Sequence, residues 1–347
     1  MKKSINYKDL KKHTQNNRQA DYQPAHQIYW TGRKSNPDIG KQYWYQEIEL
    51  SNMNAIHNNT SIDIGLIGYV CDEGVRRNLG RTGTQQGPRV LRERLAKLPI
   101  HFDTKRVADF GDVICIDEDM EGCQEAFCDV ISQLITKGIF PIAIGGGHDM
   151  AYAHFMGIRN AVKHTEKKKI GIINFDAHFD LRPVETKSNS GTPFNQIISE
   201  SKKQKKTVDY FAIGIQRQSN TKELFDIAKS NHVDFAVNYD CESSSAELLA
   251  LKERLIPFIE KNDYLYITID MDGFSSAYAP GVSAPSPLGF TPYFVFKMLR
   301  FLFDSNKVIS CDIAELNPTL DRDYVTANLA AKLVDFIVMN LNKAASF

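Results

Sequence analysis

Short apolar runs alternate along most of the chain with longer segments in which apolar residues recur every three or four positions. The runs predict buried strands that begin near Ile62, Val107, Ile139, Ile170, Val208, Val233, Tyr264 and Val308. The intervening periodic segments predict helices at 89–98, 121–137, 151–162, 221–230, 246–260, 292–303 and 324–341. Apolar strands that alternate with helices are typical of a parallel sheet covered on both faces. We therefore predict an α/β fold.

Residues 1–60 differ from the rest because polar and aromatic residues, including Trp30 and Trp44, follow no sustained period. We interpret this segment as an N-terminal extension of a catalytic domain that spans residues 61–347. The extension either packs across the domain or reaches a neighbouring subunit, or it is a partly disordered arm. No linker divides the remaining chain.

Charge and composition narrow the class of partner. The 347 residues include 42 basic and 42 acidic side chains, so the formal net charge at pH 7 is zero. This balance gives no reason to expect nucleic acid or a membrane surface, and it favours a small-molecule substrate. The six cysteines form no Cys-x-x-Cys pair, and the chain has neither a signal-peptide core nor a membrane-spanning run. These features predict a cytoplasmic protein with reduced thiols.

Residues of metal-ligand type directly follow three of the predicted strands. The strand at 170–173 leads into an Asp-x-His-x-Asp triplet, whose three polar side chains point to one side of an extended backbone. The strand at 264–269 ends in Asp-x-Asp, and the strand at 139–144 is followed by Gly-Gly-Gly-His-Asp. Parallel sheets build their sites at such strand ends. The candidate ligands are His148, Asp176, His178, Asp180, Asp270 and Asp272.

Four carboxylates and two imidazoles without a thiolate suit manganese, with zinc, cobalt or iron as alternatives. Six ligands exceed the need of one catalytic ion, so we predict a two-metal centre. Considered alone, an Asp-x-Asp pair is more often a turn or a cap. The glycines before His148 could instead cradle a phosphate, but neither the dinucleotide fingerprint nor Gly-Lys-Ser/Thr is present.

These motifs resemble the ureohydrolase family, which includes arginase, agmatinase and formimidoylglutamase. The matching stretches are Gly145–Asp149, Asp176–Asp180, Asp270–Asp272 and Ala314–Pro318, and with the surrounding elements the resemblance covers roughly residues 62–340. It implies a three-layer α/β/α arginase-like fold around a parallel sheet, two Mn²⁺ per chain and assembly into a homo-oligomer.

The same resemblance implies a role for each ligand. One ion would be held by His148 and Asp180, the other by His178 and Asp272, with Asp176 and Asp270 bridging both. Glu315 matches the acid that receives the cationic nitrogen end of the substrate.

Two features distinguish members of this family. Arginase-like chains carry Ser-Gly-Asn-Leu-His after the triplet, and the His serves as a proton shuttle, whereas this chain has Ser190-Gly191-Thr192-Pro193-Phe194. The stretches 176–182, 190–194 and 279–285 look most like formimidoylglutamase, an enzyme of histidine degradation. The resemblance thus implies cleavage of N-formimidoyl-L-glutamate to L-glutamate and formamide. The alternatives are agmatinase or another guanidine hydrolase that releases urea, or a catalytically silent metal-binding relative.

A substrate derived from glutamate carries two carboxylates, so its site needs cations near the metals. The candidates are Arg182, two residues beyond a ligand, and Arg81 and Arg217, which lie in loops after strands. The alternative for each of the three is an ordinary surface arginine without a role in substrate binding. Our mechanistic hypothesis is that the metal pair lowers the pKa of a bridging water and that hydroxide attacks the formimidoyl carbon. Asp180 would accept the proton and Glu315 would hold the amidinium-like end.

Overall fold

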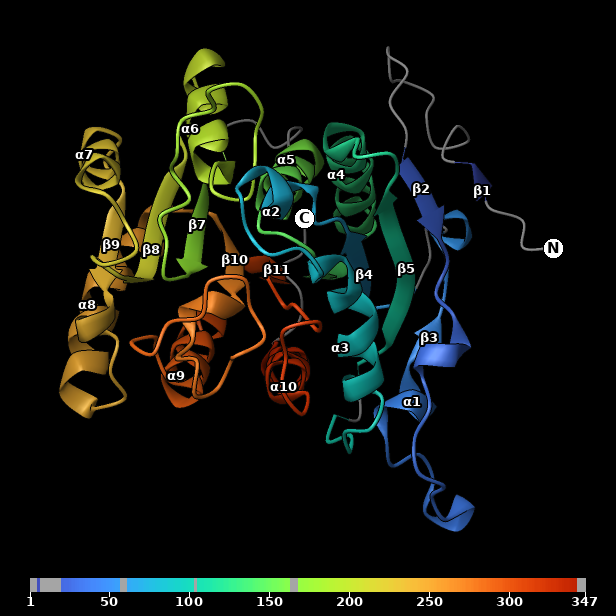
Figure 1. Cartoon of the computed structure of the whole chain (residues 1–347). Coiled ribbons are helices and arrows are strands. Elements are labelled where there is room, and N and C mark those ends of the chain that lie inside the picture. The colour runs from blue at the N-terminus through green and yellow to red at the C-terminus, as the bar shows by residue number, and fades with distance from the viewer. Residues whose placement is uncertain (1–4, 7–19, 57–60, 103–104, 163–167, 342–347) are drawn as a thin grey trace.

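The computed structural model describes residues 5–6, 20–56, 61–102, 105–162 and 168–341. Among these residues, eleven strands form one sheet in the order β1-β2-β5-β4-β6-β11-β10-β7-β8-β9, with β3 paired to β5 (Figure 1). The pairings from β5 through to β9 are parallel, and those of β1 with β2 and β2 with β5 are antiparallel. The strands are β1 (Ile5–Asn6), β2 (Ala20–Gln23), β3 (Glu49–Leu50), β4 (Ile64–Val70), β5 (Val107–Cys115), β6 (Phe140–Ile144), β7 (Ile170–Phe175), β8 (Asp209–Ile215), β9 (Asp234–Val237), β10 (Tyr264–Asp270) and β11 (Val308–Ala314).

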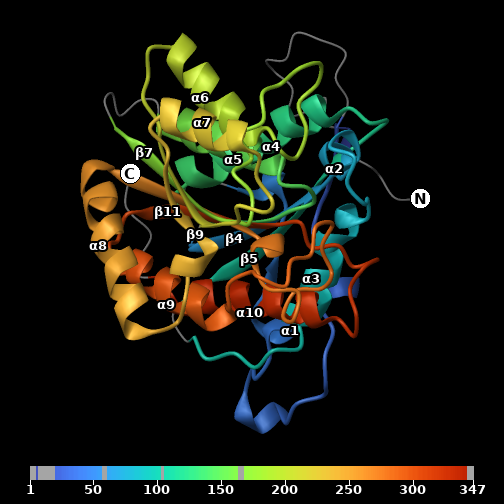
Figure 2. The same cartoon turned by 60° about the vertical axis from the view of Figure 1, so that its left-hand side comes forward.

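Helices cover both faces of the sheet, which confirms the predicted three-layer α/β/α architecture (Figures 1 and 2). One layer contains α4 (Met120–Thr136), α5 (Met150–Ala161), α6 (Pro193–Lys203) and α7 (Lys222–Ser230), and the opposite layer contains α3 (Gly87–Leu95), α8 (Ser245–Lys261), α9 (Pro292–Phe303) and α10 (Val325–Asn340). The predicted helices agree with these bounds to within a few residues. The sequence pattern does not predict α6, the short α1 (Trp44–Glu47) or α2 (Glu73–Arg77).

The central strands β6, β7, β10 and β11 are buried along their whole length because each side chain meets a helical layer. On β7, Ile172 belongs to the core beneath α4, α5 and α6, and Ile173 to the core beneath α8 and α9. The same alternation separates Ala143 from Ile142 on β6. Two apolar cores on either side of the sheet therefore hold its strand ends in fixed positions.

The described part of the N-terminal segment extends the sheet, since β2 and β3 both pair with β5. Indole N–H groups anchor the segment: Trp30 donates to Asp109 at 2.8 Å, and Trp44 donates to Asp335 at 2.7 Å. Both indoles are buried. Residues 1–4, 7–19 and 57–60 lie outside the described residues, and the division into an extension and a catalytic domain stays a prediction.

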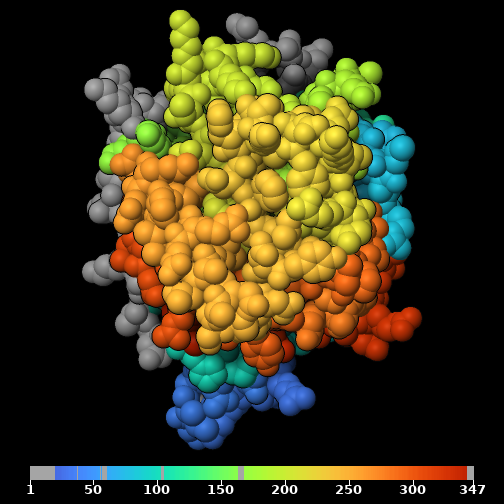
Figure 3. All heavy atoms as spheres, turned by 90° about the vertical axis from the view of Figure 1, so that its left-hand side faces the viewer, coloured from blue at the N-terminus to red at the C-terminus, as the bar shows by residue number. Residues whose placement is uncertain are grey.

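Strand β9 forms one edge of the sheet, and α7 and α8 flank it (Figure 1). Figure 3 shows this side of the molecule, which is formed largely by the yellow and orange residues around α7 and α8. Across the described residues, no helix has the length and apolar character needed to cross a membrane. All six cysteine thiols are free, in agreement with the predicted absence of a disulfide framework.

Candidate metal centre

The strand order explains why motifs far apart in the sequence come together. Strands β6, β11, β10 and β7 are consecutive neighbours and parallel, so their carboxyl ends meet at one edge of the sheet. His148 follows β6, the triplet follows β7, Asp270 and Asp272 lie at the end of β10, and Glu315 follows β11. The structure brings all seven of these predicted site residues to this edge.

Local hydrogen bonds turn successive side chains toward the same place. A carboxylate oxygen of Asp176 accepts the backbone N–H of His178 at 2.7 Å, and Asp270 accepts that of Asp272 at 2.8 Å. Asp180 and Glu315 have φ values of 49° and 65°, in the left-handed region that non-glycine residues rarely adopt. Such conformations cluster at functional sites, where the surrounding structure enforces them.

The glycines before His148 permit a close approach between two loops. The N–H groups of Gly146 and Gly147 donate to the carbonyl oxygens of Tyr69 and Cys71, at 2.9 and 3.0 Å. A Cβ atom on Gly146 would lie 1.8 Å from the Cys71 carbonyl oxygen, so no other residue fits there without backbone movement. The glycines thus fix the loop that carries His148.

The six candidate ligands form two groups that share Asp176. Nδ1 of His148 lies 3.2 Å from Asp176 and 3.0 Å from both Asp180 and Asp270. Nδ1 of His178 lies 3.5 Å from the other oxygen of Asp176 and 3.1 Å from Asp272. Each group has the composition and spacing to hold one ion. Asp270 falls in the first group only, so its bridging role stays a prediction.

The donor atoms suit a pair of divalent cations. Within the described residues, His148 Nδ1 and Asp272 Oδ1 are buried and have no partner in hydrogen-bonding geometry, although carboxylates surround the imidazole nitrogen. Buried polar atoms normally have such partners, and an ion would satisfy both. Carboxylate oxygens and neutral imidazoles are hard to borderline ligands of the kind that manganese binds.

Mutual contacts shift the pKa values of the ligands in the metal-free protein. Burial alone would lower the pKa of His148 and of His178, but the neighbouring carboxylates raise both well above the usual value. Burial, together with the charge of Asp176, raises the pKa of Asp180 to about 6. In the metal-free protein the carboxylates thus favour the protonated imidazoles, and a bound ion would take the place of those protons.

Glu315 is a buried acid beside the ligands. Burial raises its pKa to about 8, against the effect of the His148 backbone N–H, which donates to Glu315 at 2.9 Å. The side chain is 5% exposed and lines the cavity above the metal ligands. A cationic ligand beside this carboxyl group would lower its pKa and so favour its charged form.

A cavity of about 280 Å³ opens onto both ligand groups, and Asn78, Arg182 and Ser190 line it. The Arg182 guanidinium donates to Asn78 at 2.7 Å, and Asn78 donates to Ser190 at 3.1 Å. Among the three candidate arginines, Arg182 is the one that the structure places in this cavity. No pattern in the sequence singles out Asn78 or Ser190 individually, because isolated Asn and Ser residues in loops carry no periodic signal.

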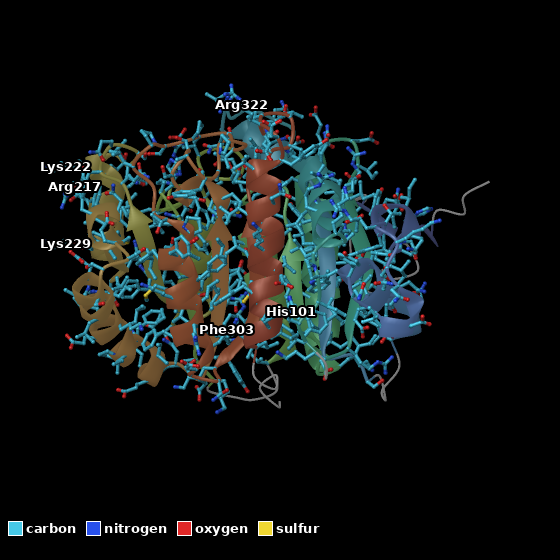
Figure 4. All side chains as sticks on the ribbon, turned by 90° about the horizontal axis from the view of Figure 1, so that it is seen from below. His101, Arg217, Lys222, Lys229, Phe303 and Arg322 are labelled. Carbon is cyan, nitrogen blue, oxygen red and sulfur yellow. The ribbon has the colours of Figure 1, made fainter. Side chains whose placement is uncertain are left out.

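The other two candidate arginines do not line this cavity, and their role at the substrate stays a prediction. Arg81 directs its guanidinium to the carbonyl oxygens of Val282 and Ser283, which accept from Nε and from one terminal nitrogen. Arg217 is exposed, lies 5.5 Å from the Phe225 ring centre and stands at the periphery beside Lys222 (Figure 4). In both cases the loop conformation, rather than the residue type, decides where the charge lies.

Phe194 occupies a buried position beneath the centre. Its ring lies 5.5 Å from the ring of His148 in an edge-on arrangement and stacks on Tyr210 at 4.4 Å. The side chain is fully buried and does not line the cavity. At the position where the arginase pattern has a histidine, this chain thus has a packed phenylalanine, which cannot carry a proton.

Known proteins resemble this chain both in sequence and in fold. Residues 62–339 match the model of the arginase family. A formimidoylglutamase of Clostridium tetani is 38% identical over 333 residues, covering 93% of this chain and 97% of that protein. A formimidoylglutamase structure from Bacillus subtilis superposes with a TM-score of 0.73 at 21% identity, over 83% of this chain and 90% of that one. A structure of Trypanosoma cruzi formiminoglutamase with Mn²⁺ superposes with a TM-score of 0.73 at 24% identity. The match covers 84% of this chain and 97% of that one.

Proposed function

Because the chain belongs to the arginase family, we propose that it is a binuclear manganese hydrolase that cleaves N-formimidoyl-L-glutamate to L-glutamate and formamide. The observation that carries the proposal is the pair of ligand groups that are joined through Asp176 and line the cavity. The relatives that cover almost the whole chain are formimidoylglutamases, which supports this substrate over a guanidine.

Six side chains would hold the ions. His148, Asp180 and Asp270 lie around one position and His178 and Asp272 around the other, with one oxygen of Asp176 toward each. Manganese is supported by the oxygen-rich donor set and by its presence in the solved Trypanosoma cruzi relative. When bound, a metal pair lowers the pKa of water and supplies hydroxide at neutral pH.

Two acids of the site would have separate roles, substrate binding for Glu315 and proton transfer for Asp180. Glu315, buried beside the ligands, would bind the cationic formimidoyl nitrogen and hold the carbon above the ions. Asp180 would accept the proton from the attacking water and pass it toward the glutamate nitrogen, because that nitrogen must leave as a neutral amine. Water adds to the formimidoyl carbon, the bond from this carbon to the glutamate nitrogen breaks, and formamide and glutamate result.

Arg182 would recognise a substrate carboxylate at the other end of the cavity. Its guanidinium donates a hydrogen bond to Asn78, and Asn78 donates to Ser190. The guanidinium is therefore oriented before substrate binds. Preorientation lowers the entropy lost on binding. The homo-oligomer and the cytoplasmic location remain predictions.

Product analysis tests the proposal directly. Manganese-loaded protein is given N-formimidoyl-L-glutamate, arginine or agmatine in separate reactions, and glutamate, formamide and urea are measured. We expect glutamate and formamide from the first reaction alone. Urea from either of the others would identify a guanidine hydrolase, and no product from any would identify a silent relative.

Substitution of Asp270 with Asn tests the metal centre. The change removes a charge from the group around His148 while keeping the size of the side chain. We expect binding of fewer than two Mn²⁺ per chain and loss of turnover by at least ~10³-fold, as befits a lost ligand of a two-metal site. Metal content and rate are measured on the same sample; wild-type values of both would overturn the two-ion scheme.

A further inference from the structure

Asn174 interrupts the otherwise apolar strand β7 and lies beside the ligand that joins the two groups. Its side-chain amide nitrogen donates to Oδ2 of Asp176 and to the hydroxyl oxygen of Tyr210, in both cases at 3.0 Å. Tyr210 in turn donates to the backbone carbonyl of Phe179 at 3.0 Å. The side chains of Asn174 and Asp176 are fully buried, and that of Tyr210 is 2% exposed. Neither Asn174 nor Tyr210 has a part in the proposed catalysis, so this contact needs its own explanation.

The sheet places the two side chains next to each other. Asn174 pairs in register with Ala212 on β8, and Tyr210 lies two residues before Ala212 and so points to the same face. The phenol ring stacks on Phe194, with 4.4 Å between the ring centres. Strand register and ring packing together fix the hydroxyl beside the amide.

The hydrogen bonds allow one orientation of the Asn174 amide. The hydrogen of the Tyr210 hydroxyl goes to a backbone carbonyl, so its oxygen accepts, and the Asp176 carboxylate also only accepts. Both neighbours therefore need a hydrogen, and the amide nitrogen carries two. The amide oxygen points away from them, buried and, within the described residues, without a hydrogen-bond partner. Asn174 is thus held as a double donor.

Each oxygen of Asp176 has one hydrogen-bond donor and faces one ligand group. Oδ1 accepts the backbone N–H of His178 at 2.7 Å and lies 3.5 Å from Nδ1 of the same residue. Oδ2 accepts from Asn174 and lies 3.2 Å from Nδ1 of His148. Without the amide of Asn174, the carboxylate would keep only the hydrogen bond on Oδ1 and could rotate about its Cβ–Cγ bond. Such a rotation would carry Oδ2 away from His148.

We propose that Asn174 is a positioning residue that holds Oδ2 of Asp176 toward the ion at His148. Tyr210 orients the amide for this role. The carboxylate is then kept in the geometry that bridges two ions, instead of turning both oxygens to one of them. Loss of a hydrogen-bond partner of a metal ligand typically weakens metal binding ~10- to 100-fold. The inference rests on the metal pair of the proposed function.

Asn174→Leu is the test, with Asn262→Leu as its matched control. Asn262 is also buried, donates from its amide nitrogen to the carbonyl of Phe258, and has a buried amide oxygen without a partner among the described residues. It precedes β10, at the opposite end of this strand from Asp270. Mn²⁺ is titrated into each metal-free protein, and the free ion is followed by its electron paramagnetic resonance signal. We expect one of the two sites to weaken ~10- to 100-fold in Asn174→Leu and both to keep wild-type affinity in Asn262→Leu.

The resonance signal of the bound ions separates a positioning role from a structural one. Two Mn²⁺ ions that share a bridging carboxylate are magnetically coupled, so their joint signal changes when the carboxylate turns. At saturating Mn²⁺, we expect an altered coupled signal in Asn174→Leu and a wild-type signal in Asn262→Leu. Wild-type affinities and a wild-type coupled signal in Asn174→Leu, with only a lower melting temperature, would overturn the inference.

If Asn174→Leu fails to fold, Tyr210→Phe decides. This variant keeps the ring on Phe194 and removes the oxygen that accepts from the amide. Its control is Tyr22→Phe, since Tyr22 is also a buried phenol and donates to the carbonyl of Phe110 on β5. Weaker Mn²⁺ binding at one site in Tyr210→Phe alone supports the inference, and wild-type binding in Tyr210→Phe refutes it.

The two proposals fail in different ways. A wild-type protein that does not bind two Mn²⁺ would defeat both of them. Two tight sites that depend on Asn174, in a protein that leaves N-formimidoyl-L-glutamate intact, would defeat the substrate assignment and keep the positioning role.

Discussion

Glu315 combines two tasks that one substitution can separate. Its carboxylate accepts the His148 backbone N–H, and its charge is available to a cation in the cavity. Glu315→Gln retains an oxygen acceptor and removes the charge. We expect Mn²⁺ binding to persist while kcat/KM for N-formimidoyl-L-glutamate falls by at least ~10²-fold, the usual loss of one electrostatic partner of the reacting group. Metal titration and steady-state kinetics measure the two effects; unchanged kinetics would remove Glu315 from substrate binding.

Arg182 can be tested against another arginine of the same chain. Arg182→Met removes the guanidinium from the cavity, whereas Arg217→Met removes an exposed one that lies over Phe225. We expect KM for N-formimidoyl-L-glutamate to rise by ~10- to 100-fold in the first variant, equivalent to about 1.4–2.7 kcal/mol of lost carboxylate binding, and to stay constant in the second. A larger effect of Arg217→Met would reverse the assignment.

At the residue scale, position relative to the strands decides what the sequence can reveal. His148, Asp176 and Asp270 follow apolar runs that alternate with helices and so predict parallel strands. Because the carboxyl ends of parallel strands meet at one edge of a sheet, this order was enough to predict that the three side chains lie together. Arg81 lies in a loop of similar composition, yet its guanidinium binds carbonyl oxygens of another loop. Such contacts depend on loop conformation, which no local pattern of residue types specifies.

At the scale of elements, the loop after β6 depends on its contact with the end of β4. Gly146→Ala would place a methyl group 1.8 Å from the Cys71 carbonyl oxygen, so the backbone must shift. We expect a loss of ~2–4 kcal/mol in the free energy of unfolding, in the upper range for single substitutions, and weaker Mn²⁺ binding at His148. Denaturant unfolding of the metal-free protein measures the first effect and metal titration the second.

Gly145→Ala is the matched control in the same loop. Its Cβ would meet the terminal methyl of Met150 at 2.7 Å, and this flexible side chain can move aside. The nearest backbone atom, the Ile313 carbonyl oxygen, would lie at 3.2 Å, much farther than the 1.8 Å at Gly146. A smaller loss of stability than in Gly146→Ala is therefore expected. Equal losses in both variants would show that the loop tolerates no side chain at all, rather than one specific close approach.

Element prediction succeeded where apolar residues are periodic. Helix α9 runs from Pro292 to Phe303 as predicted, because its apolar side chains recur at helical spacing and Pro292 occupies the first turn. Strand β2, with the sequence Ala-Asp-Tyr-Gln, carries little apolar signal, since it pairs antiparallel near the sheet edge and buries one face. Edge strands of this kind depend on a partner that is distant in sequence.

At the scale of the whole molecule, the sheet gathers two histidines and several carboxylates in one buried place, and this sets the pH dependence of metal binding. Burial alone would lower the pKa of His148 and His178, but the carboxylates around them raise both well above the usual value. Below these raised values each imidazole carries a proton that an ion must displace. The affinity for Mn²⁺ therefore falls as the pH falls and rises as the pH rises, by up to ~10-fold per pH unit for each proton released.

Calorimetric titration of Mn²⁺ into metal-free protein at several pH values, in buffers of different ionisation enthalpy, measures both the affinity and the number of protons released. We expect proton release at neutral pH and a plateau of affinity only above the raised pKa values. The direction of this pH dependence follows from the clustering of the side chains. In the metal-free site the carboxylates favour protonated imidazoles, and bound ions supply the positive charge in place of those protons. An affinity that is constant between pH 6 and 8, without proton release, would mean that both histidines are already neutral and that the carboxylates are compensated elsewhere.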